Sequence, residues 1–394
     1  MKRFYMPARY LPALALALAL SGCGTQSPAA QPTAIPATAA PAPTSAPAAQ
    51  PTAAPEATAV PAPTSAPEPT AQPVNLPELY YVDGNAVFAQ AIGGAAHQIA
   101  PVDGSVLDTA LSGDTLLVLR DSGIERVHLP DGAASDVLAF KSPAQPSSSL
   151  LATSDGRIFY AARVEDPNAV FGKTEIGVYD VATGATAPLQ TAEGAARPLG
   201  LTPDGKGLYV LPVGGDPSFG QVRVIDAASG ADRAELAVEG EGAAVVSPDG
   251  RMLAVTARRF SASDPNAEPD SLIYLYDLTQ QPAKRTEIVP PQAPSAANNL
   301  FWSPDSRALY FALGAGNIYE LNKSYGLWVY DIASAKASKL SDVDVLNTFV
   351  TDSAASTIVL LRRTISSDSA VLDLATGAPT PFDIAPNAMV AGWR

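Results

Sequence analysis

Cysteine and histidine are almost missing from this chain of 394 residues, which contains one cysteine, Cys23, and two histidines, His97 and His128. One cysteine excludes a disulfide within the chain and a metal cluster built on cysteines. Two histidines leave almost no candidates for a histidine-dependent triad, and no G-x-S-x-G motif marks a nucleophilic serine. The sequence therefore identifies no catalytic residue, and we expect both histidines to be structural.

Positive charge is also scarce, since 25 lysines and arginines stand against 39 aspartates and glutamates, for a formal net charge of −14. An acidic surface repels the phosphates of nucleic acids and of anionic lipid head groups. We therefore expect no nucleic-acid partner. The same charge keeps an exported protein soluble, or suits a cation or a basic partner.

The N-terminus contains an apolar run, LPALALALAL at 11–20, that is too short for a stable membrane span. Basic residues precede it, and LSGC, which ends at Cys23, follows it directly. This order resembles a bacterial lipoprotein signal peptide. The resemblance implies removal of 1–22, acylation of Cys23 by palmitate-like chains and anchoring to the cell membrane on its extracytoplasmic side. An ordinary secretory signal with an incidental cysteine is the alternative.

Large apolar side chains are nearly absent from 23–75, which consists almost entirely of Ala, Pro, Thr, Ser and Gln and repeats PAPTSAP at 41–47 and 61–67. Such a segment buries too little apolar surface to offset the entropy lost on ordering. We predict a disordered Pro-rich tether between the lipidated cysteine and a folded domain at 76–394.

Two motifs alternate through this domain. The first is a strand, a polar turn and a second strand, as in LGLTPDGKGLYVL, AVVSPDGRMLAVT and LFWSPDSRALYFA. The second begins a third strand, as in IGVYDVATG, VRVIDAASG and LWVYDIASA. Their alternation gives four-stranded units at a spacing of roughly 40 to 55 residues, which is typical of β-propeller blades. A β-sandwich is the alternative, but it gives no reason for one turn sequence to recur at this spacing.

The two ends of the domain together supply one blade. Six complete units run from about residue 106 to residue 385 and leave two fragments, 76–100 and 387–394. The first fragment supplies three strands and the second supplies one. We therefore predict an all-β fold, a seven-bladed β-propeller of four-stranded blades that is closed when the C-terminal strand joins the N-terminal blade.

The turn motif resembles that of TolB-type, WD40-like propellers, whose blades carry Ser-Pro-Asp-Gly between their first and second strands. The match is complete at 247–250 and nearly complete at 202–205 and 303–306. The resemblance implies a fold but no single function, because such propellers serve as scaffolds, binding modules and companion domains of hydrolases. A Pro-rich segment stands where TolB-type proteins have an α/β domain, so no role in the Tol system is implied.

Loop length indicates where a ligand would bind. In such a propeller the links from second to third strand share a face with the links between blades, and in blades three to six they are long. We predict a binding rim on that face. Its side chains offer oxygen ligands or flat apolar contacts and are Asp166, Asn168, Phe171, Asp216, Phe219, Asp264, Asn266, Asp270, Tyr319 and Tyr325. The mixture suits a calcium ion, a carbohydrate or a peptide.

The alternative for these residues is that they only start turns, with the acids paired to Arg163, Arg258 and Arg259. For the whole protein the main hypothesis is a membrane-anchored, non-catalytic module that binds or scaffolds a protein, peptide or glycan of the cell envelope without a cofactor.

Two other functions stay open. One is a propeller hydrolase or lactonase that uses carboxylates and a metal at the channel mouth; inward-facing Asp, Glu and Asn would favour it, and Val, Ala and Ser would count against it. The other is a purely structural assembly partner, which an apolar patch outside the rim would indicate.

Overall fold

The computed structural model describes residues 77–166, 172–213, 218–259, 270–291, 296–316, 321–342, 347–350, 358–362, 369–374, 377–385 and 388–394. These residues belong to one compact unit, Gln72–Arg394. They form strands and turns and contain no helix, and so none that is long and apolar enough to cross a membrane.

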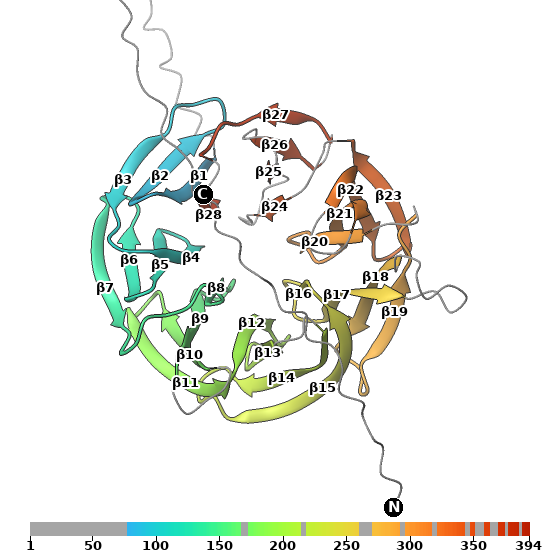
Figure 1. The fold of residues 1–394 in the computed structure, drawn as a ribbon, viewed down its shortest axis with the longest axis horizontal. Helices are drawn as coiled ribbons and strands as arrows, with labels where there is room; N and C mark the ends of the chain where they lie inside the picture. The colour runs from blue at the N-terminus through green and yellow to red at the C-terminus, as the bar shows by residue number, and fades with distance from the viewer. Residues whose placement is uncertain are drawn as a thin grey trace, which may run out of the picture. The chain divides into compact units, whose positions relative to one another are not determined.

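The strands form seven four-stranded antiparallel sheets arranged as the blades of a ring (Figure 1). From the innermost strand outwards, blade 1 contains β28 (Met389–Trp393), β1 (Glu78–Asp83), β2 (Ala86–Ala91) and β3 (His97–Pro101). Blade 2 contains β4 (Val106–Ser112), β5 (Thr115–Arg120), β6 (Gly123–His128) and β7 (Ala133–Ala139). Blade 3 contains β8 (Ser149–Ala152), β9 (Arg157–Val164), β10 (Lys173–Asp180) and β11 (Ala185–Glu193).

Blade 4 contains β12 (Ala195–Leu201), β13 (Gly207–Val213), β14 (Ser218–Asp226) and β15 (Asp232–Glu241). Blade 5 contains β16 (Ala244–Val246), β17 (Met252–Arg259), β18 (Asp270–Asp277) and β19 (Lys284–Ile288). Blade 6 contains β20 (Ala296–Trp302), β21 (Ala308–Gly316), β22 (Leu321–Asp331) and β23 (Lys336–Ser341). Blade 7 contains β24 (Asn347–Val350), β25 (Ile358–Arg362), β26 (Ser369–Asp373) and β27 (Pro379–Pro381). The predicted fold class and blade count are confirmed.

The core lies between the blades. Each of seven apolar clusters joins residues from two adjacent blades, as Leu117 of blade 2 and Tyr160 of blade 3 do in one of them. The second strand of a blade is buried on both sides, so β5 is buried along its whole length, while the outermost strand β7 is largely exposed. Continuous Val and Leu runs in the middle strands follow from this packing.

The chain ends close the ring as predicted. β28 pairs with β1, and Glu78 and Arg394 exchange two backbone hydrogen bonds of 2.9 Å. Trp393, 1% exposed, packs with Phe382 at the interface with blade 7. β28 therefore covers the edge of β1 that would otherwise be free.

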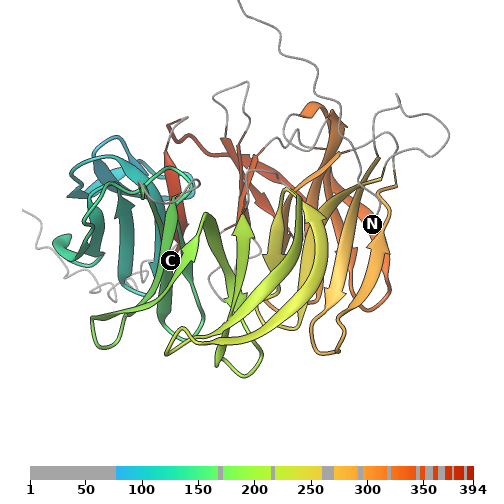
Figure 2. The ribbon, with the colours of Figure 1, turned by 60° about the horizontal axis from the view of Figure 1, so that its bottom comes forward.

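The two faces of the ring carry different connections (Figure 2). We call the turn face the one that holds the turns between first and second strands and between third and fourth strands. We call the link face the opposite one, which holds the links from second to third strand and those between blades. Backbone hydrogen bonds join the two kinds of link on the link face, as from Val102 N to Asn85 O (2.8 Å) and from Gly194 N to Gly172 O (3.0 Å).

Some strands extend further than expected. Phe219, Asp270 and Tyr325, predicted to lie in loops, belong to β14, β18 and β22. The segments between second and third strands are consequently shortest in blades 1 and 2 (84–85 and 121–122) and longest in blades 5 and 3 (260–269 and 165–172). Blade 7, expected to have a short link, has 363–368 between its strands, which is longer than 317–320 in blade 6.

Candidate functional site

The innermost strands carry their polar residues near the link face. Each of these strands follows a link between blades, so its first residues lie nearest to that face. In their first halves stand Asp108 (β4), Ser149 (β8), Arg197 (β12), Asn298 and Asn299 (β20), and Asn347 (β24). The second halves, as in Leu199–Leu201 of β12, are mostly apolar. The centre of the ring is therefore polar towards the link face and apolar towards the turn face.

Asp108 is the one acidic residue on the seven innermost strands. Its Oδ1 accepts a hydrogen bond from Thr109 N (2.8 Å), and its Oδ2 accepts one from Leu150 N of the next blade (2.7 Å). Loss of hydration raises the pKa of Asp108 to about 6, against the opposing effects of these two N–H donors and of Arg197. At neutral pH this carboxylate is mainly ionised and is held rigidly between two blades.

Arg197 lies on β12, so one innermost strand, β8, separates it from β4 and Asp108. Its Nη2 donates to the carbonyl oxygen of Ala244 in blade 5 (3.3 Å). Its Nε is buried and has no hydrogen-bond partner among the described residues. Burial lowers the pKa of Arg197 from its ordinary value, and the charge of Asp108 opposes that shift.

Other buried polar atoms without a described partner gather at the same ends of the strands. They are Arg120 Nε, Ser149 Oγ, Ser271 Oγ and Ser369 Oγ. Glu125 Oε2 makes no hydrogen bond but lies 3.5 Å from Arg120 Nη1 in an ion pair. Arg120 is otherwise well bonded, to the Asp103 carbonyl oxygen (3.1 Å) and the Asp136 carboxylate (2.5 Å). Three further such atoms, Arg126 Nε, Gln190 Oε1 and Trp393 Nε1, lie away from these strand ends. Since a buried polar group normally has a partner, the larger group marks the link face.

The turn face shows the opposite situation. In blades 3 to 6 a Ser or Thr hydroxyl donates to the Asp two residues ahead, as from Thr202 to Asp204 (2.5 Å) and from Ser303 to Asp305 (2.6 Å). These bonds hold the pKa values of Asp204 and Asp305 below their usual range. In blades 3 to 6 the Asp that ends the third strand, such as Asp226, accepts from the following turn in the same way. These aspartates are committed to turns.

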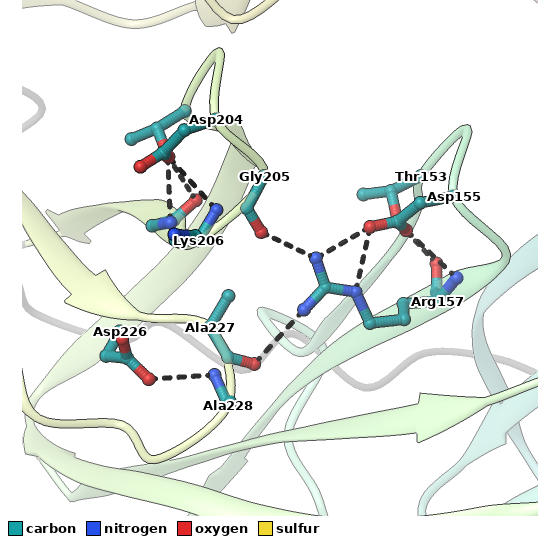
Figure 3. A network of polar contacts seen from close by, with 11 residues as sticks. Thr153, Asp155, Arg157, Asp204, Gly205, Lys206, Asp226, Ala227 and Ala228 are labelled. Atoms are coloured by element: carbon teal, nitrogen blue, oxygen red, sulfur yellow. Dashed lines mark hydrogen bonds and ion pairs between the residues drawn. The ribbon is translucent and has the colours of Figure 1, made fainter.

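Neighbouring blades are also tied together on the turn face. Arg157 of blade 3 donates from Nη2 to the Gly205 carbonyl oxygen (2.8 Å) and from Nη1 to that of Ala227 (3.4 Å), both in blade 4 (Figure 3). Asp249 N donates to the Ser306 hydroxyl oxygen (3.1 Å), which joins blade 5 to blade 6. The polar groups of these turns are thus used by the fold itself.

The structure describes the side-chain contacts of two of the predicted rim residues, and these contacts differ. Asp166 forms an ion pair with Lys173 (Oδ2–Nζ 2.6 Å) across the base of the link in blade 3. Tyr325 is half-buried against the cluster between blades 5 and 6, and its carbonyl oxygen accepts from Trp328 Nε1 (3.2 Å). These two residues stand in blades 3 and 6, which are not adjacent.

For the other predicted rim residues the structure describes no side-chain contacts that would form a site. For Phe219 and Asp270 only the strand position is described. The remaining six lie outside the described residues, as does Cys23: Asn168, Phe171, Asp216, Asp264, Asn266 and Tyr319. Arg258, offered as a partner of these acids, makes a two-pronged ion pair with Glu241.

Neither a metal centre nor a large apolar patch is found in the described part of the chain. No group of three or more His, Cys, Asp or Glu side chains there could hold a metal ion. The large apolar side chains exposed there are Val213 and Val289, at 38% and 55%. Val213 ends β13 and Val289 follows β19, so both lie towards the link face.

Sequence reasoning missed Asp108 and Arg197, although a signal was present. Each is a charged residue in a strand whose counterparts in other blades carry Ser, Ala or Asn. A charged residue in a strand that precedes a repeated turn is therefore a signal for a site, as a long loop is.

Comparisons with known proteins agree with the fold. No protein-family model matches the chain, and no curated protein matches it. Among solved structures, hydrazine synthase of Kuenenia stuttgartiensis is similar over 81% of this chain and 99% of its own, with 13% identity and a TM-score of 0.51. A putative 6-phosphogluconolactonase of Bacteroides fragilis is similar over 82% and 98%, with 13% identity and a TM-score of 0.50.

TolB of Acinetobacter baumannii also matches, over 66% of this chain and 62% of its own, with 17% identity and a TM-score of 0.41. At such identities the likeness concerns the fold alone. The names of the first two proteins state unrelated activities, so function has to be argued from the site.

Proposed function

We propose that this protein is an extracytoplasmic lipoprotein, anchored through Cys23, whose propeller binds a protein, peptide or glycan of the cell envelope on its link face without catalysis. The observation that carries the proposal is the contrast between the faces. Most of the buried polar atoms that lack a described hydrogen-bond partner lie towards the link face, while the turns of blades 3 to 6 bond their own Asp, Ser and Thr side chains.

The shape of the link face supports this assignment. Within the part of the chain that the structure describes, both exposed large apolar side chains, Val213 and Val289, lie towards this face. Apolar contacts with a few convergent polar groups are typical of a binding surface. The links between second and third strands also differ in length from blade to blade, and binding residues concentrate in such segments.

The membrane anchor is supported by the order of basic residues, apolar run and LSGC at the N-terminus. Metabolic labelling with palmitate tests it. We expect label in the full-length protein and none in Cys23→Ala, with the wild type in the membrane fraction. Equal labelling of the two proteins, or an unlabelled wild type, would disprove the anchor.

The class of ligand can be tested by thermal unfolding of the purified full-length protein in detergent. A ligand that binds only the folded state raises the midpoint by mass action. We expect the unfolding midpoint to stay unchanged with calcium or chelator. If the ligand is a glycan, one member of a glycan panel should raise the midpoint. If the ligand is a protein, no glycan should raise it, and a protein partner should be found instead. A calcium-dependent rise that Asp166→Asn abolishes would overturn the non-catalytic proposal in favour of a metal-assisted hydrolase or lactonase.

The hydrolase alternative lacks a supporting constellation in the described residues. Paired-carboxylate hydrolysis needs two acidic groups at one place, and metal-assisted hydrolysis needs a set of side-chain ligands for the ion. The innermost strands supply Asp108 alone, with amide side chains at Asn298 and Asn299. A binding function requires no second carboxylate.

A further inference from the structure

Asp108 and Arg197 hold opposite charges on either side of one innermost strand. β4 carries Asp108, β12 carries Arg197, and β8 lies between them. Both side chains retain some exposed surface, yet both are enclosed enough that loss of hydration dominates their pKa values. Each is also fixed to a neighbouring blade, Asp108 by Leu150 N and Arg197 by Ala244 O. The two charges are therefore positioned before any ligand arrives.

The bonding of the two groups is incomplete. Among the described residues, Arg197 has one hydrogen bond and a longer-range attraction to Asp108, and its Nε–H has no acceptor. The hydroxyl oxygen of Ser149, on the strand between them, is buried without a partner as well. A buried guanidinium without a paired anion is costly, and a bound carboxylate would remove that cost.

The geometry of the two groups defines a complementary ligand. A guanidinium presents Nε–H and Nη–H in a planar fork that matches a carboxylate. A carboxylate that already accepts two backbone N–H groups keeps lone pairs for one more cationic donor, such as an ammonium. An anion alone would be repelled by Asp108, and a cation alone by Arg197. A ligand with both charges meets neither repulsion.

We infer that the centre of the ring, between β4, β8 and β12, binds a small zwitterion of the amino-acid class, with its carboxylate on Arg197 and its ammonium on Asp108. Ser149 supplies a further hydrogen bond between the two charges. This inference goes beyond the proposed macromolecular partner on the link face, because it concerns a small molecule held by Asp108 and Arg197 at the ring centre.

Isothermal titration calorimetry on the purified full-length protein in detergent at pH 7.5 tests the inference. The probes are glycine, β-alanine, γ-aminobutyrate and 6-aminohexanoate, in which the distance between the charges increases, with acetate and methylammonium as single-charge controls. We expect at least one zwitterion to bind at least tenfold more tightly than both controls. Zwitterions that bind no better than acetate, or a series without any binding, would overturn the site.

Variants then assign the residues. We expect Arg197→Gln and Asp108→Asn each to weaken the best probe at least tenfold. Arg223→Gln, which removes an arginine of the same blade that is paired with Asp232 on its outer side, should leave the affinity unchanged. Unchanged binding in Arg197→Gln would overturn the inference. If that variant fails to fold, the comparison of zwitterions with single-charge probes on the wild type decides alone.

Failure of this site and failure of the proposed function are distinguishable. A negative titration series leaves the membrane anchor and a partner on the link face untouched. A missing partner leaves a positive titration series equally intact.

Discussion

The two faces of the ring use similar residues in opposite ways. On the turn face, aspartates accept hydrogen bonds from hydroxyl groups and backbone amides of their own turns, and Arg157 joins two blades through carbonyl oxygens. Near the link face, Arg197 and Ser149 keep buried atoms without a described partner. The contrast teaches that an acidic, turn-rich surface is no sign of a site by itself. What distinguishes a site is bonding capacity that the fold leaves unused.

The contrast between the two faces depends on a closed ring. We therefore expect the largest loss of stability from a change that opens the ring. Deletion of 387–394 removes β28 and Trp393, which is 1% exposed, and leaves β1 with a free edge. We expect loss of cooperative unfolding in circular dichroism. Trp393→Ala, which keeps the strand, should lower the free energy of unfolding by about 3–5 kcal/mol. A cooperative transition at the wild-type midpoint after the deletion would contradict closure by β28.

The rigidity of the turn face can be broken at one glycine. Gly250 has φ +72°, and an added Cβ would lie 2.2 Å from the Leu201 carbonyl oxygen of blade 4. We expect Gly250→Ala to cost about 3 kcal/mol or more, because it adds a clash with backbone to the strain of a positive φ.

Gly205 is the matched control, since its φ is +66° and nothing lies within 4 Å of its added Cβ. Gly205→Ala should cost only about 1–2 kcal/mol. Chemical unfolding of both variants checks the difference. Equal losses would show that the turns of blades 4 and 5 do not pack as tightly as described.

The buried charge at the ring centre can be measured through pH. The pKa of Asp108 in the folded protein is about 6, above its ordinary value of 3.8, so its ionisation opposes folding. Its contribution to stability is full below about pH 4 and is lost as the pH rises through 6. We expect the wild type to gain about 2 kcal/mol relative to Asp108→Asn when the pH falls from 7.5 to 4.5.

This experiment contains its own control. Replacing one carboxylate oxygen by an amide changes stability by an amount that does not depend on pH, so it cancels when the same two proteins are compared at several pH values. Urea unfolding at several pH values gives the comparison. A difference between the two proteins that does not change with pH would show that Asp108 is well hydrated.

A smaller effect is expected from the tie between blades 3 and 4. Arg157→Gln removes the hydrogen bonds to Gly205 and Ala227 and should cost about 1–2 kcal/mol. Arg307, whose side chain is 85% exposed, is the control on the same face. Arg307→Gln should stay within about 0.5 kcal/mol of the wild type. Similar losses in both would mean that the bonds of Arg157 add nothing on the turn face.

Much of the fold was predictable because its signals are local. Pro248, Asp249 and Gly250 each favour the backbone conformation of their turn by residue type alone, and the same turn recurs at a blade-like spacing. The closure of blade 1 was predicted because the N-terminal fragment has three strands and the C-terminal fragment has the missing fourth. The pairing of β28 with β1 confirms it.

The site was less predictable because it depends on distant pairs. Strands β14 and β18 continue to Phe219 and Asp270 because these residues pair with Gly240 and Arg259. The carboxylate of Asp108 meets Leu150 of the next blade, and Arg197 meets Ala244 of the following one. The alternation of polar and apolar residues within one strand does not predict such contacts between blades. The rim at Asp264 and its neighbours stays a prediction.

The most direct test of the central claim compares cross-linking from the two faces. In Cys23→Ser protein, a single cysteine at Glu165 (link face) or Arg307 (turn face), both exposed, is labelled with a photoactivatable maleimide and mixed with envelope extract. We predict a discrete cross-linked product from position 165 that unlabelled protein competes away, and none from position 307. Equal products from both positions, or a product from 307 alone, would contradict the assignment of binding to the link face.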